Sequence, residues 1–531
     1  MQKGLKMSPI FIYDTTLRDG SQTEGVSFSV TDKIKITEKL NDLGVHYVEG
    51  GWPGSNPKDK EFFQIMKSRE LKNSRVVAFG STRRAKISVS NDQNLRELVK
   101  SGTKAITIFG KTWDLHVRDV IKTTLDENLK MISESVHFLK SKDREVFYDA
   151  EHFFDGYKHN PDYALKTILA AQEAKADCII FCDTNGGTLP QEIRRILEEI
   201  KNKISVPMGI HVHNDLDLAV ANSLAAIEEG CTQVQGTLNG LGERCGNADL
   251  CTIIGILHTK MKIKSIPDKN ISKLMETAYF LSEISNSRLA DNHPFVGHSA
   301  FAHKAGVHID AMLKNPLAYE HMDPEIVGNH RRFVTSELAG KMPIVMQAKK
   351  MDIIIDKKST EAQKLLKALQ KKELGGYQFE AADASFELFM KRALKQYRPF
   401  FKLEGFKVAS EKRIDGKVFA EASIRLKVNG EEKFSAAEGH GPVDALDRAL
   451  RQALTKFYPN LTNMHLSDYK VRVLDTQSGT AAKVRVLIES QDDTDSWTTI
   501  GVHENIIQAS WEALLDSVEY KILKDSKTIK K

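Results

Sequence analysis

The chain has 531 residues, of which 41% are hydrophobic and 28% charged, with a formal net charge of +5 and a pI near 8.6. It is too long for one hydrophobic core and suggests about three domains at ~150 residues each. The mild basic excess favours small acidic ligands and is far from a nucleic-acid-binding signature, and no apolar run approaches the ~18 residues of a membrane span, so neither nucleic acid nor a membrane is an expected partner.

The first residues and the cysteines indicate the compartment. The start of the chain, MQKGLKMSPIF, has no apolar core of the kind found in export signals. The five cysteines are scattered and lack C-x-x-C spacing, which is typical of reduced thiols that serve in packing. We therefore expect a cytoplasmic protein.

Short β-rich runs alternate with helical patterns over the first half of the chain. Segments such as 31–43 and 191–200 carry the 3.6-residue apolar spacing of amphipathic helices. Eight strand–helix units in about 265 residues match a (β/α)8 TIM barrel, which we place at residues 8–275. The predicted strands are Ile10–Tyr13, Tyr47–Glu49, Val76–Phe79, Ala105–Phe109, Val146–Tyr148, Cys178–Phe181, Val206–Val212 and Thr232–Gly236.

A doubly wound open sheet is the alternative for the same alternation of strands and helices. Such a fold would favour a glycine-rich dinucleotide or phosphate loop after the first strand. Neither G-x-G-x-x-G nor a Walker pattern stands there. The barrel is therefore the preferred prediction.

Polar side chains gather after the carboxyl ends of several predicted strands, where barrel enzymes place their chemistry. His211 and His213 are two apart at the end of one strand, before a helix predicted at 216–226, so both imidazoles point to one face. A lone H-x-H is weak evidence for a metal, and the joint pattern is stronger. The polar segments at the other strand ends are Asp14–Gln22, Asp149–His152, Asp183–Gly187 and Asn239–Asn247.

Three motifs carry a resemblance to a known family: Asp14-Thr-Thr-Leu-Arg-Asp-Gly20, His211-Val-His-Asn-Asp215 and Gly242-Glu-Arg-Cys-Gly-Asn247. In this order and spacing they resemble the acyl-CoA-condensing branch of the metal-dependent pyruvate-aldolase-like barrels. That branch holds the 2-isopropylmalate, homocitrate and citramalate synthases, and the resemblance covers nearly the whole chain. The segment Glu49–Asp59, with Trp52-Pro53 where the first two groups usually have Phe-Pro, resembles the citramalate group.

The resemblance implies a divalent-metal site. Its ligands here would be Asp19, His211 and His213, with Asn247 as a further ligand. One carboxylate, two imidazoles and an amide oxygen suit Mn, Mg or Zn without choosing among them. By itself, Asp19 would be an ordinary cap or turn residue.

The resemblance also implies substrate contacts. Arg18 would bind a carboxylate or a developing oxyanion through its planar guanidinium. Thr184 would donate a hydrogen bond to the carboxylate of a 2-keto acid. Gln22 would lie at the substrate and, with Asp14 and Asp215, would orient the metal ligands.

Residues 276–385 are predicted to form a helical linker subdomain. In the related synthases such a subdomain lends a histidine and a tyrosine to the active site of the partner subunit, and the matching positions are His308 and Tyr319. Glu151 and His308 would be the acid–base pair, assisted by Tyr319; the sequence does not decide which group takes the methyl proton. A lysine-rich amphipathic helix at 356–374 is predicted to be a solvated connector.

The pattern changes to alternating strands at residues 386–531, which predict an α+β domain that uses one βββα unit twice. It resembles the regulatory, dimer-forming domain of the same synthases, with 439–445 and 478–482 at the glycine-containing turns. His440 stands where many relatives have an acidic residue, which leaves the effector open. We expect a homodimer with isoleucine as effector; a purely structural dimer domain is the alternative. The predicted strands are 401–410, 418–428, 431–437, 468–474, 482–490 and 496–503, with helices from Pro442 and at 504–523.

The resemblance implies a Claisen condensation of acetyl-CoA with pyruvate that yields citramalate, a precursor of isoleucine. Phe79 and Phe109, at strand ends, are expected to limit the acceptor to a small side chain. The alternative acceptor is 2-ketoisovalerate, which would make the chain a 2-isopropylmalate synthase. A hydroxyacyl-CoA lyase usually lacks such a C-terminal domain, and a catalytically silent amino-acid sensor would need a broken metal set.

Overall fold

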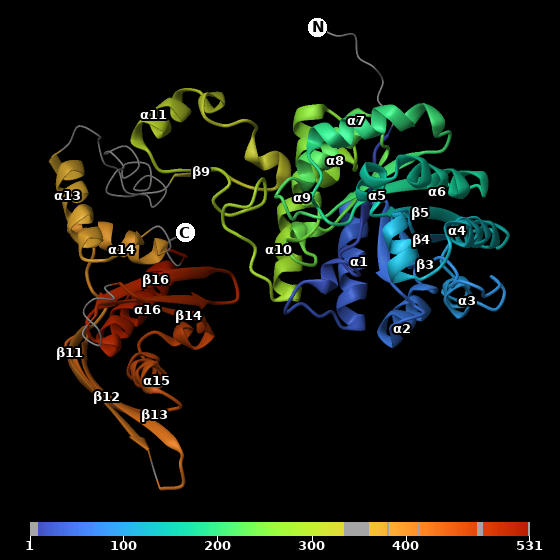
Figure 1. The fold of residues 1–531 in the computed structure, drawn as a ribbon. Helices are drawn as coiled ribbons and strands as arrows, with labels where there is room; N and C mark the ends of the chain where they lie inside the picture. The colour runs from blue at the N-terminus through green and yellow to red at the C-terminus, as the bar shows by residue number, and fades with distance from the viewer. Residues whose placement is uncertain (1–8, 334–359, 380–381, 413, 475–481, 529–531) are drawn as a thin grey trace. The chain divides into compact units, whose positions relative to one another are not determined.

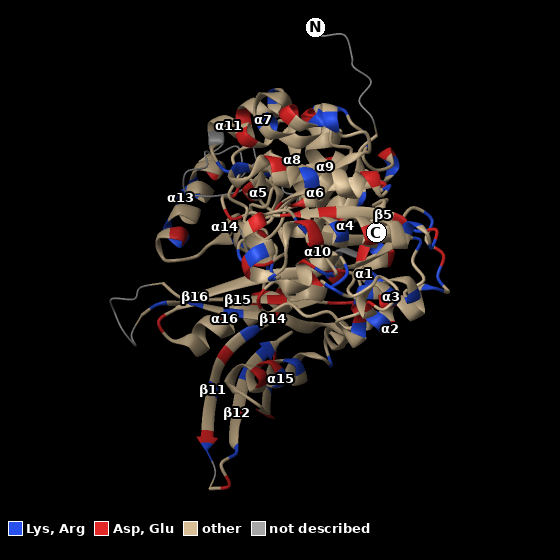
Figure 2. Cartoon of the chain, turned by 45° about the vertical axis from the view of Figure 1, so that its right-hand side comes forward, with Lys and Arg blue, Asp and Glu red and all other residues tan. Residues whose placement is uncertain are grey.

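The computed structural model describes residues 9–333, 360–379, 382–412, 414–474 and 482–528 (Figure 1). The chain forms two compact units, Met1–Phe301 with His321–Arg331, and Ala302–Glu320 with Arg332–Lys531. Each unit has its own hydrophobic core. Lys and Arg positions are interspersed with Asp and Glu positions along the helices of each unit (Figure 2).

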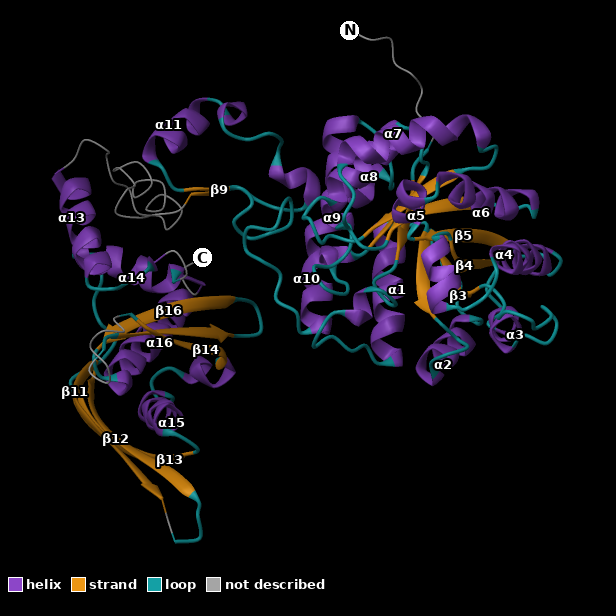
Figure 3. Ribbon diagram, in the orientation of Figure 1, coloured by secondary structure: helices purple, strands orange, loops and turns teal. Residues whose placement is uncertain are grey.

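Eight parallel strands close into a barrel in the first unit, as the sequence predicts, with helices around them (Figure 3). Strand β1 pairs with β2 on one side and with β8 on the other, which closes the sheet and excludes the open doubly wound alternative. Half of the strands are buried along their whole length, as expected for parallel strands covered on both faces. The strands are β1 (Phe11–Asp14), β2 (Tyr47–Gly51), β3 (Arg75–Ser81), β4 (Ala105–Lys111), β5 (Glu145–Glu151), β6 (Cys178–Asp183), β7 (Met208–Val212) and β8 (Gln233–Gly236).

Amphipathic helices cover the outside of the barrel. The predicted helices at 31–43 and 191–200 are confirmed as α1 and α7. Helix α8 begins at Ala219, later than predicted, because Asp217 takes a left-handed conformation and the Asn214 side chain accepts a hydrogen bond from the Ala219 amide. The helices are α1 (Val30–Leu43), α2 (Pro57–Met66), α3 (Gln93–Lys100), α4 (Leu125–Lys140), α5 (Phe153–His159), α6 (Pro161–Glu173), α7 (Pro190–Ile200), α8 (Ala219–Glu228) and α9 (Leu250–Ile256).

The barrel interior follows the two-residue period of a strand. Tyr13, Tyr47, Val77 and Phe147 belong to a small cluster in the middle of the barrel. Their sequence neighbours face outward into the larger core beneath the helices. Side chains two and four positions further along each strand therefore point into the carboxyl-terminal mouth of the barrel, which is what gathers the polar groups of the site.

The segment after the barrel strands continues the same core. Helix α10 (Leu274–Ser285) buries Leu274, Ala278 and Leu281 in the large cluster of the barrel unit. The limits that we predict for the three domains, at residues 275 and 385, stay predictions.

The second unit contains part of the predicted helical segment, because residues 276–301 and 321–331 belong to the first unit. Its elements before residue 400 are β9 (Ala302–His303), α11 (Gly306–Lys314), β10 (Arg332–Phe333), α13 (Thr360–Leu374) and α14 (Asp383–Ala393), and β9 pairs with β10 in parallel. Residues 356–359 of the predicted connector helix lie outside the described residues. Helix α13 is not fully solvated, because Ala362, Leu365 and Leu369 are buried in a cluster with residues of α14.

The βββα unit occurs twice in the rest of the second unit, as predicted. Each set of three strands forms an antiparallel sheet, and the inner faces of both sheets share one core with the two helices. Of the predicted turn at 478–482, only Ala482 is described. The elements are β11 (Lys402–Lys412), β12 (Val418–Val428), β13 (Glu431–Gly439), α15 (Pro442–Leu454), β14 (His465–Val473), β15 (Val484–Gln491), β16 (Ser496–His503) and α16 (Ile506–Thr528).

No helix in the described ranges combines the length and the apolar character that a membrane crossing would require.

Candidate active site

A cavity of about 240 Å³ opens at the carboxyl-terminal ends of the barrel strands. Seven of the residues predicted for the site line it: Arg18, Asp19, Gln22, Glu151, Thr184, His211 and His213. They come from segments up to about two hundred positions apart in the chain, and the closed barrel brings them together. The other lining residues are Trp52, Phe79, Phe109, Asp149, Cys182 and Glu243.

The four predicted metal ligands lie beside one another. His211 Nε2 is 3.5 Å from Asp19 Oδ2, and Asn247 Nδ2 is 3.4 Å from each of these two atoms. His213 pairs through its backbone with Asn247, and its ring centroid is 5.3 Å from that of His211. Two imidazoles, one carboxylate and one amide thus meet in one place.

Two polar atoms of this set are buried without a hydrogen-bond partner, which fits residues that bind a cation. The Asn247 carbonyl oxygen Oδ1 and the His213 nitrogen Nδ1 are buried without a hydrogen-bond partner. Burial lowers the pKa of His213 to about 3 and also lowers the pKa of His211, so both rings are neutral near pH 7. Neutral imidazoles with free lone pairs are the form that binds metals.

The arrangement is nevertheless not a closed metal cage. Within the described ranges, no three His, Cys, Asp or Glu side chains are grouped closely enough to hold an ion. The Arg18 guanidinium pairs with the Asp19 carboxylate. The fourth predicted ligand, Asn247, carries an amide and is not one of these four residue types. The donor chemistry fits a divalent ion.

Arg18 lies between two carboxylates. It pairs with Asp19, and its Nε donates to Glu49 Oε1 at 2.5 Å. Burial disfavours the cation, but Asp19 and Glu49 raise the pKa of Arg18 above its ordinary value. Glu49 is fully buried and also accepts a hydrogen bond from the Tyr13 hydroxyl at 2.6 Å. The guanidinium is therefore held in place and charged at the cavity wall.

Gln235 links a second buried carboxyl group to the histidine pair. The Gln235 amide nitrogen donates to Asp149 Oδ1 at 3.2 Å, and Gln235 Oε1 is 3.0 Å from His211 Nδ1. Burial raises the pKa of Asp149 well above its ordinary value, and the nearby Glu49 carboxyl raises it further.

Glu151 and Thr184 face the cavity from neighbouring strand ends. Glu151 pairs with Lys111. Thr184 Oγ1 accepts a hydrogen bond from the His152 amide at 2.9 Å. Because that oxygen is already an acceptor, its own hydroxyl proton is free to be donated to a ligand in the cavity.

Three aromatic rings form one wall of the cavity. The Phe79 and Phe109 rings are stacked at 5.5 Å, and Trp52 meets them edge-on at 5.9 and 5.7 Å. The Arg18 guanidinium lies 3.8 Å from the centre of the Phe79 ring. This aromatic wall (Trp52, Phe79 and Phe109) therefore stands directly beside the charged groups, and the predicted pair of phenylalanines is part of it.

Polar contacts hold Trp52 in the wall. The indole nitrogen donates to Asn94 Oδ1 at 2.7 Å, and the Trp52 amide donates to Asp59 Oδ2 at 2.9 Å. Asp59 is buried and paired with Lys33. Gly51 has φ of 127°, and a Cβ there would lie 2.3 Å from the Asp59 carboxylate, so only glycine allows this approach.

Two residues expected to orient the metal ligands bond elsewhere. Asp14 accepts from the amide and the hydroxyl of Thr16 at 2.9 and 2.8 Å. Asp215 forms a two-bond pair with Arg244 at 2.8 and 2.9 Å. The structure shows Gln235 in contact with a predicted ligand instead.

The sequence analysis placed Asp149 in a polar segment at a strand end but gave it no role, and it missed Glu49 and Gln235 as members of the site. Glu49 and Asp149 stand two positions after the inward-facing Tyr47 and Phe147, and two positions before the ends of their strands. Gln235 stands one position before the end of β8. The sequence did contain a signal for such residues. A polar residue that lies an even number of positions from an inward-facing residue, near the end of a strand, points into the mouth of the barrel.

His308 and Tyr319 belong to the second unit, in α11 and directly after the short helix Pro316–Ala318. Their rings are stacked, with centroids 4.2 Å apart. Their roles stay predictions.

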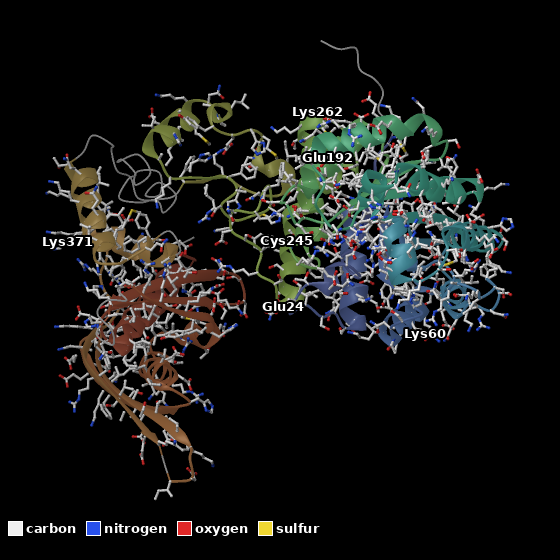
Figure 4. The ribbon with its side chains drawn as sticks, viewed as in Figure 1. Glu24, Lys60, Glu192, Cys245, Lys262 and Lys371 are labelled. Atoms are coloured by element: carbon white, nitrogen blue, oxygen red, sulfur yellow. The ribbon has the colours of Figure 1, made fainter. Side chains whose placement is uncertain are left out.

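All five cysteines are free thiols, as expected. Cys178, Cys182, Cys231 and Cys251 are buried, whereas Cys245, labelled in Figure 4, is exposed in the loop after β8.

Comparison with family models divides the chain into three matches. Residues 9–281 match the HMGL-like family, residues 295–373 the homocitrate synthase post-HMGL domain-like family, and residues 380–522 the LeuA allosteric (dimerisation) domain.

Several individual proteins are similar to this chain. The chain is 54% identical over 519 residues to an (R)-citramalate synthase of Geobacter sulfurreducens, covering 98% of each protein. It is 32% identical over 527 residues to a 2-isopropylmalate synthase of Methanocaldococcus jannaschii, covering 98% of this chain and 96% of that one. A solved HMG-CoA lyase from Bacillus subtilis covers 54% of this chain and 97% of its own, at 21% identity and a TM-score of 0.46.

Proposed function

This chain belongs to the (R)-citramalate synthases of the HMGL-like family, and from that premise we propose that it condenses acetyl-CoA with pyruvate. The reaction consumes one water and yields (R)-citramalate and CoA. It is an acyl transfer in which the acetyl group becomes an alkyl group.

The aromatic wall is the observation that most favours pyruvate. Trp52, Phe79 and Phe109 stand beside Arg18, which is the predicted partner of the acceptor carboxylate. An acceptor held by Arg18 would point its side chain at these rings, and a methyl group needs less room there than an isopropyl group. The full-length identity to (R)-citramalate synthases supports the same acceptor.

Asp19, His211, His213 and Asn247 would hold a divalent ion of Mn, Mg or Zn. When bound, such an ion supplies Lewis-acid polarisation of the keto group. Gln22, which lines the same cavity, would contact the substrate beside these residues.

Arg18 and Thr184 would orient the keto acid. Arg18 keeps its charge because Asp19 and Glu49 flank it, so it can balance the negative charge that develops on the keto oxygen during attack. Thr184 would donate its free hydroxyl proton to the acceptor carboxylate. The two donors would hold the keto carbon with one face open to attack.

Proton transfer is assigned to Glu151 and His308, with Tyr319 assisting. One of the pair would take a proton from the acetyl-CoA methyl group, and the resulting enolate carbon would form the new bond to the keto carbon of pyruvate. Water would then cleave the thioester bond and release CoA. Glu151 is on the cavity wall and paired with Lys111.

We propose that His308 and Tyr319 serve the barrel of a partner subunit in a homodimer. The match to a LeuA allosteric (dimerisation) domain supports dimer formation. Mixing inactive Asp19→Ala subunits with inactive His308→Ala subunits should restore part of the activity. In the mixed dimer, the barrel that retains Asp19 receives His308 from its partner and so has a complete set of catalytic residues. Absence of recovery after confirmed subunit exchange would count against this arrangement.

Isoleucine is the proposed effector of the C-terminal domain, in a cytoplasmic enzyme of isoleucine biosynthesis. An inhibitor that acts there must bind the less active state more tightly. Because isoleucine is the end product of the proposed pathway, it should inhibit the full-length protein at lower concentration than leucine. The opposite order would favour the 2-isopropylmalate branch.

The central test is a CoA-release assay with acetyl-CoA and a panel of pyruvate, 2-ketobutyrate and 2-ketoisovalerate, each with and without chelator. Pyruvate should give the highest kcat/KM, and removal of the divalent ion should abolish turnover. Full activity in metal-free buffer would overturn the mechanism. A higher kcat/KM for 2-ketoisovalerate would overturn the acceptor.

A further inference from the structure

Gln235 occupies an unusual position in β8. Its side chain is fully buried inside the barrel, yet it is not among the side chains that line the cavity. It contacts two groups, the Asp149 carboxyl and the His211 ring. A buried amide with two partners costs less to bury than an unpaired one, but nothing in barrel packing requires an amide at this point.

The Gln235 amide faces Asp149 with its nitrogen atom. The amide nitrogen can only donate, and it donates to Asp149 Oδ1 at 3.2 Å. The amide oxygen Oε1 is turned toward His211 Nδ1. The reversed orientation would turn the amide nitrogen toward His211 and put the proton of the neutral ring on Nε2.

The amide orientation in turn decides the proton position on His211. Gln235 Oε1 can only accept, so the proton of the neutral ring is on Nδ1, 3.0 Å away. The other nitrogen, Nε2, then carries the lone pair. Nε2 is the atom that lies 3.5 Å from Asp19 Oδ2 and 3.4 Å from the Asn247 amide.

We propose that Gln235 is a positioning residue that holds His211 in the Nδ1-protonated form, so that the Nε2 lone pair is presented to a divalent ion beside Asp19 and Asn247. This inference rests on the proposed function in one respect, the use of a divalent ion. It assigns to Asp149 the role of orienting the Gln235 amide. The chain of contacts thus runs from Asp149 through Gln235 to His211.

Gln233 provides a matched comparison in the same strand. It lies two positions earlier, is also buried, and its side-chain oxygen has no hydrogen-bond partner. Both glutamines therefore place an amide inside the barrel, but only Gln235 contacts a predicted ligand. Replacing either one by leucine removes an amide of the same size from the same strand.

The first measurement is Mn²⁺ affinity of the metal-stripped full-length protein, by titration calorimetry. Gln235→Leu should bind Mn²⁺ about 10–100-fold more weakly, the usual effect of losing a hydrogen-bond partner of a ligating histidine. Gln233→Leu should bind within about twofold of the unsubstituted protein. Gln235→Glu keeps an acceptor for Nδ1–H and should retain most of the affinity, because a protonated Asp149 can donate to it.

The second measurement reads the ring directly. With ¹⁵N-labelled histidine, the metal-free unsubstituted protein should show the His211 signal of an Nδ1-protonated ring, assigned by its loss in His211→Ala. In Gln235→Leu the signal should shift toward a mixture of the two neutral forms. This measurement on the unsubstituted protein stands even if Gln235→Leu folds poorly.

The outcomes separate this inference from the proposed function. Equal Mn²⁺ affinity of Gln235→Leu and Gln233→Leu, or an Nε2-protonated His211, would overturn the role of Gln235 while leaving the citramalate synthase proposal intact. An unsubstituted protein that binds no Mn²⁺, Mg²⁺ or Zn²⁺ and turns over without them would overturn the proposed mechanism itself.

Discussion

Phe109→Val should widen the range of acceptors. The Phe109 ring is half-buried at the end of β4 and contacts both other rings of the aromatic wall. Valine is β-branched and suits a strand, but the substitution removes the ring from the cavity. The space released lies where the side chain of the keto acid is expected, so 2-ketoisovalerate should gain more than pyruvate.

The size of the effect follows from the two acceptors. An isopropyl group is larger than a methyl group by two carbons, and burying a methylene-sized group is worth about 0.8 kcal/mol. The apolar gain is therefore about 1.6 kcal/mol, within the ~1–3 kcal/mol, or about 10–200-fold, that apolar pockets use to discriminate. The ratio of kcat/KM for pyruvate to that for 2-ketoisovalerate should fall by a factor in this range.

The assay is CoA release with each acceptor, on variants whose folding is checked by thermal unfolding. Phe11→Val is the matched control, because Phe11 is also a partly exposed aromatic residue in a barrel strand but lies at the first position of β1, away from the cavity. The control should leave the acceptor ratio unchanged. A folded Phe109→Val variant with the original ratio would refute the assignment of the wall to the acceptor side chain.

Three further changes test other parts of the site. Asn94→Ala leaves the Trp52 indole N–H without its hydrogen-bond partner at 2.7 Å, so the aromatic wall should loosen at a cost of about 1 kcal/mol. The expected result is a lower Tm and a smaller ratio of kcat/KM for pyruvate to that for 2-ketoisovalerate. An unchanged ratio would contradict this. Burial raises the pKa of Asp14 to about 7, although hydrogen bonds from Thr16 oppose the rise. The folded-state pKa thus exceeds the unfolded value near 3.8. The stability that this group contributes is therefore complete below about pH 3.8 and is lost as the pH rises through 7. The free energy of unfolding should fall by up to about 1.4 kcal/mol per pH unit in this window. Asp14→Asn should flatten the pH dependence of the free energy of unfolding between pH 4 and 7, measured by urea titration, and an identical slope in both proteins would refute it. His213→Ala should lose both bound metal and turnover while its Tm stays close to that of the original protein; metal analysis showing a normal content would remove His213 from the ligand set.

Much of the fold could be predicted because its signals are local. Alternating strands and amphipathic helices repeat along residues 8–275, and the βββα pattern repeats near the C-terminus, so each element is recognisable within its own window of sequence. Parallel barrel strands all end at one rim, which is why the polar segments after Asp14, Asp183 and His211 could be assigned to one site before any distance was known.

The sequence by itself determined which residue types stand at the strand ends, and the motifs around Asp19, His211 and Asn247 were sufficient to indicate a metal site. Only the tertiary structure decided what surrounds them. Gln235 and Asp149 are 86 positions apart, and Arg18 and Glu49 are 31 apart, so no local pattern pairs them. A hydrogen bond depends on the separation of two atoms to within a few tenths of an ångström, and that separation is determined by the register and closure of eight strands together.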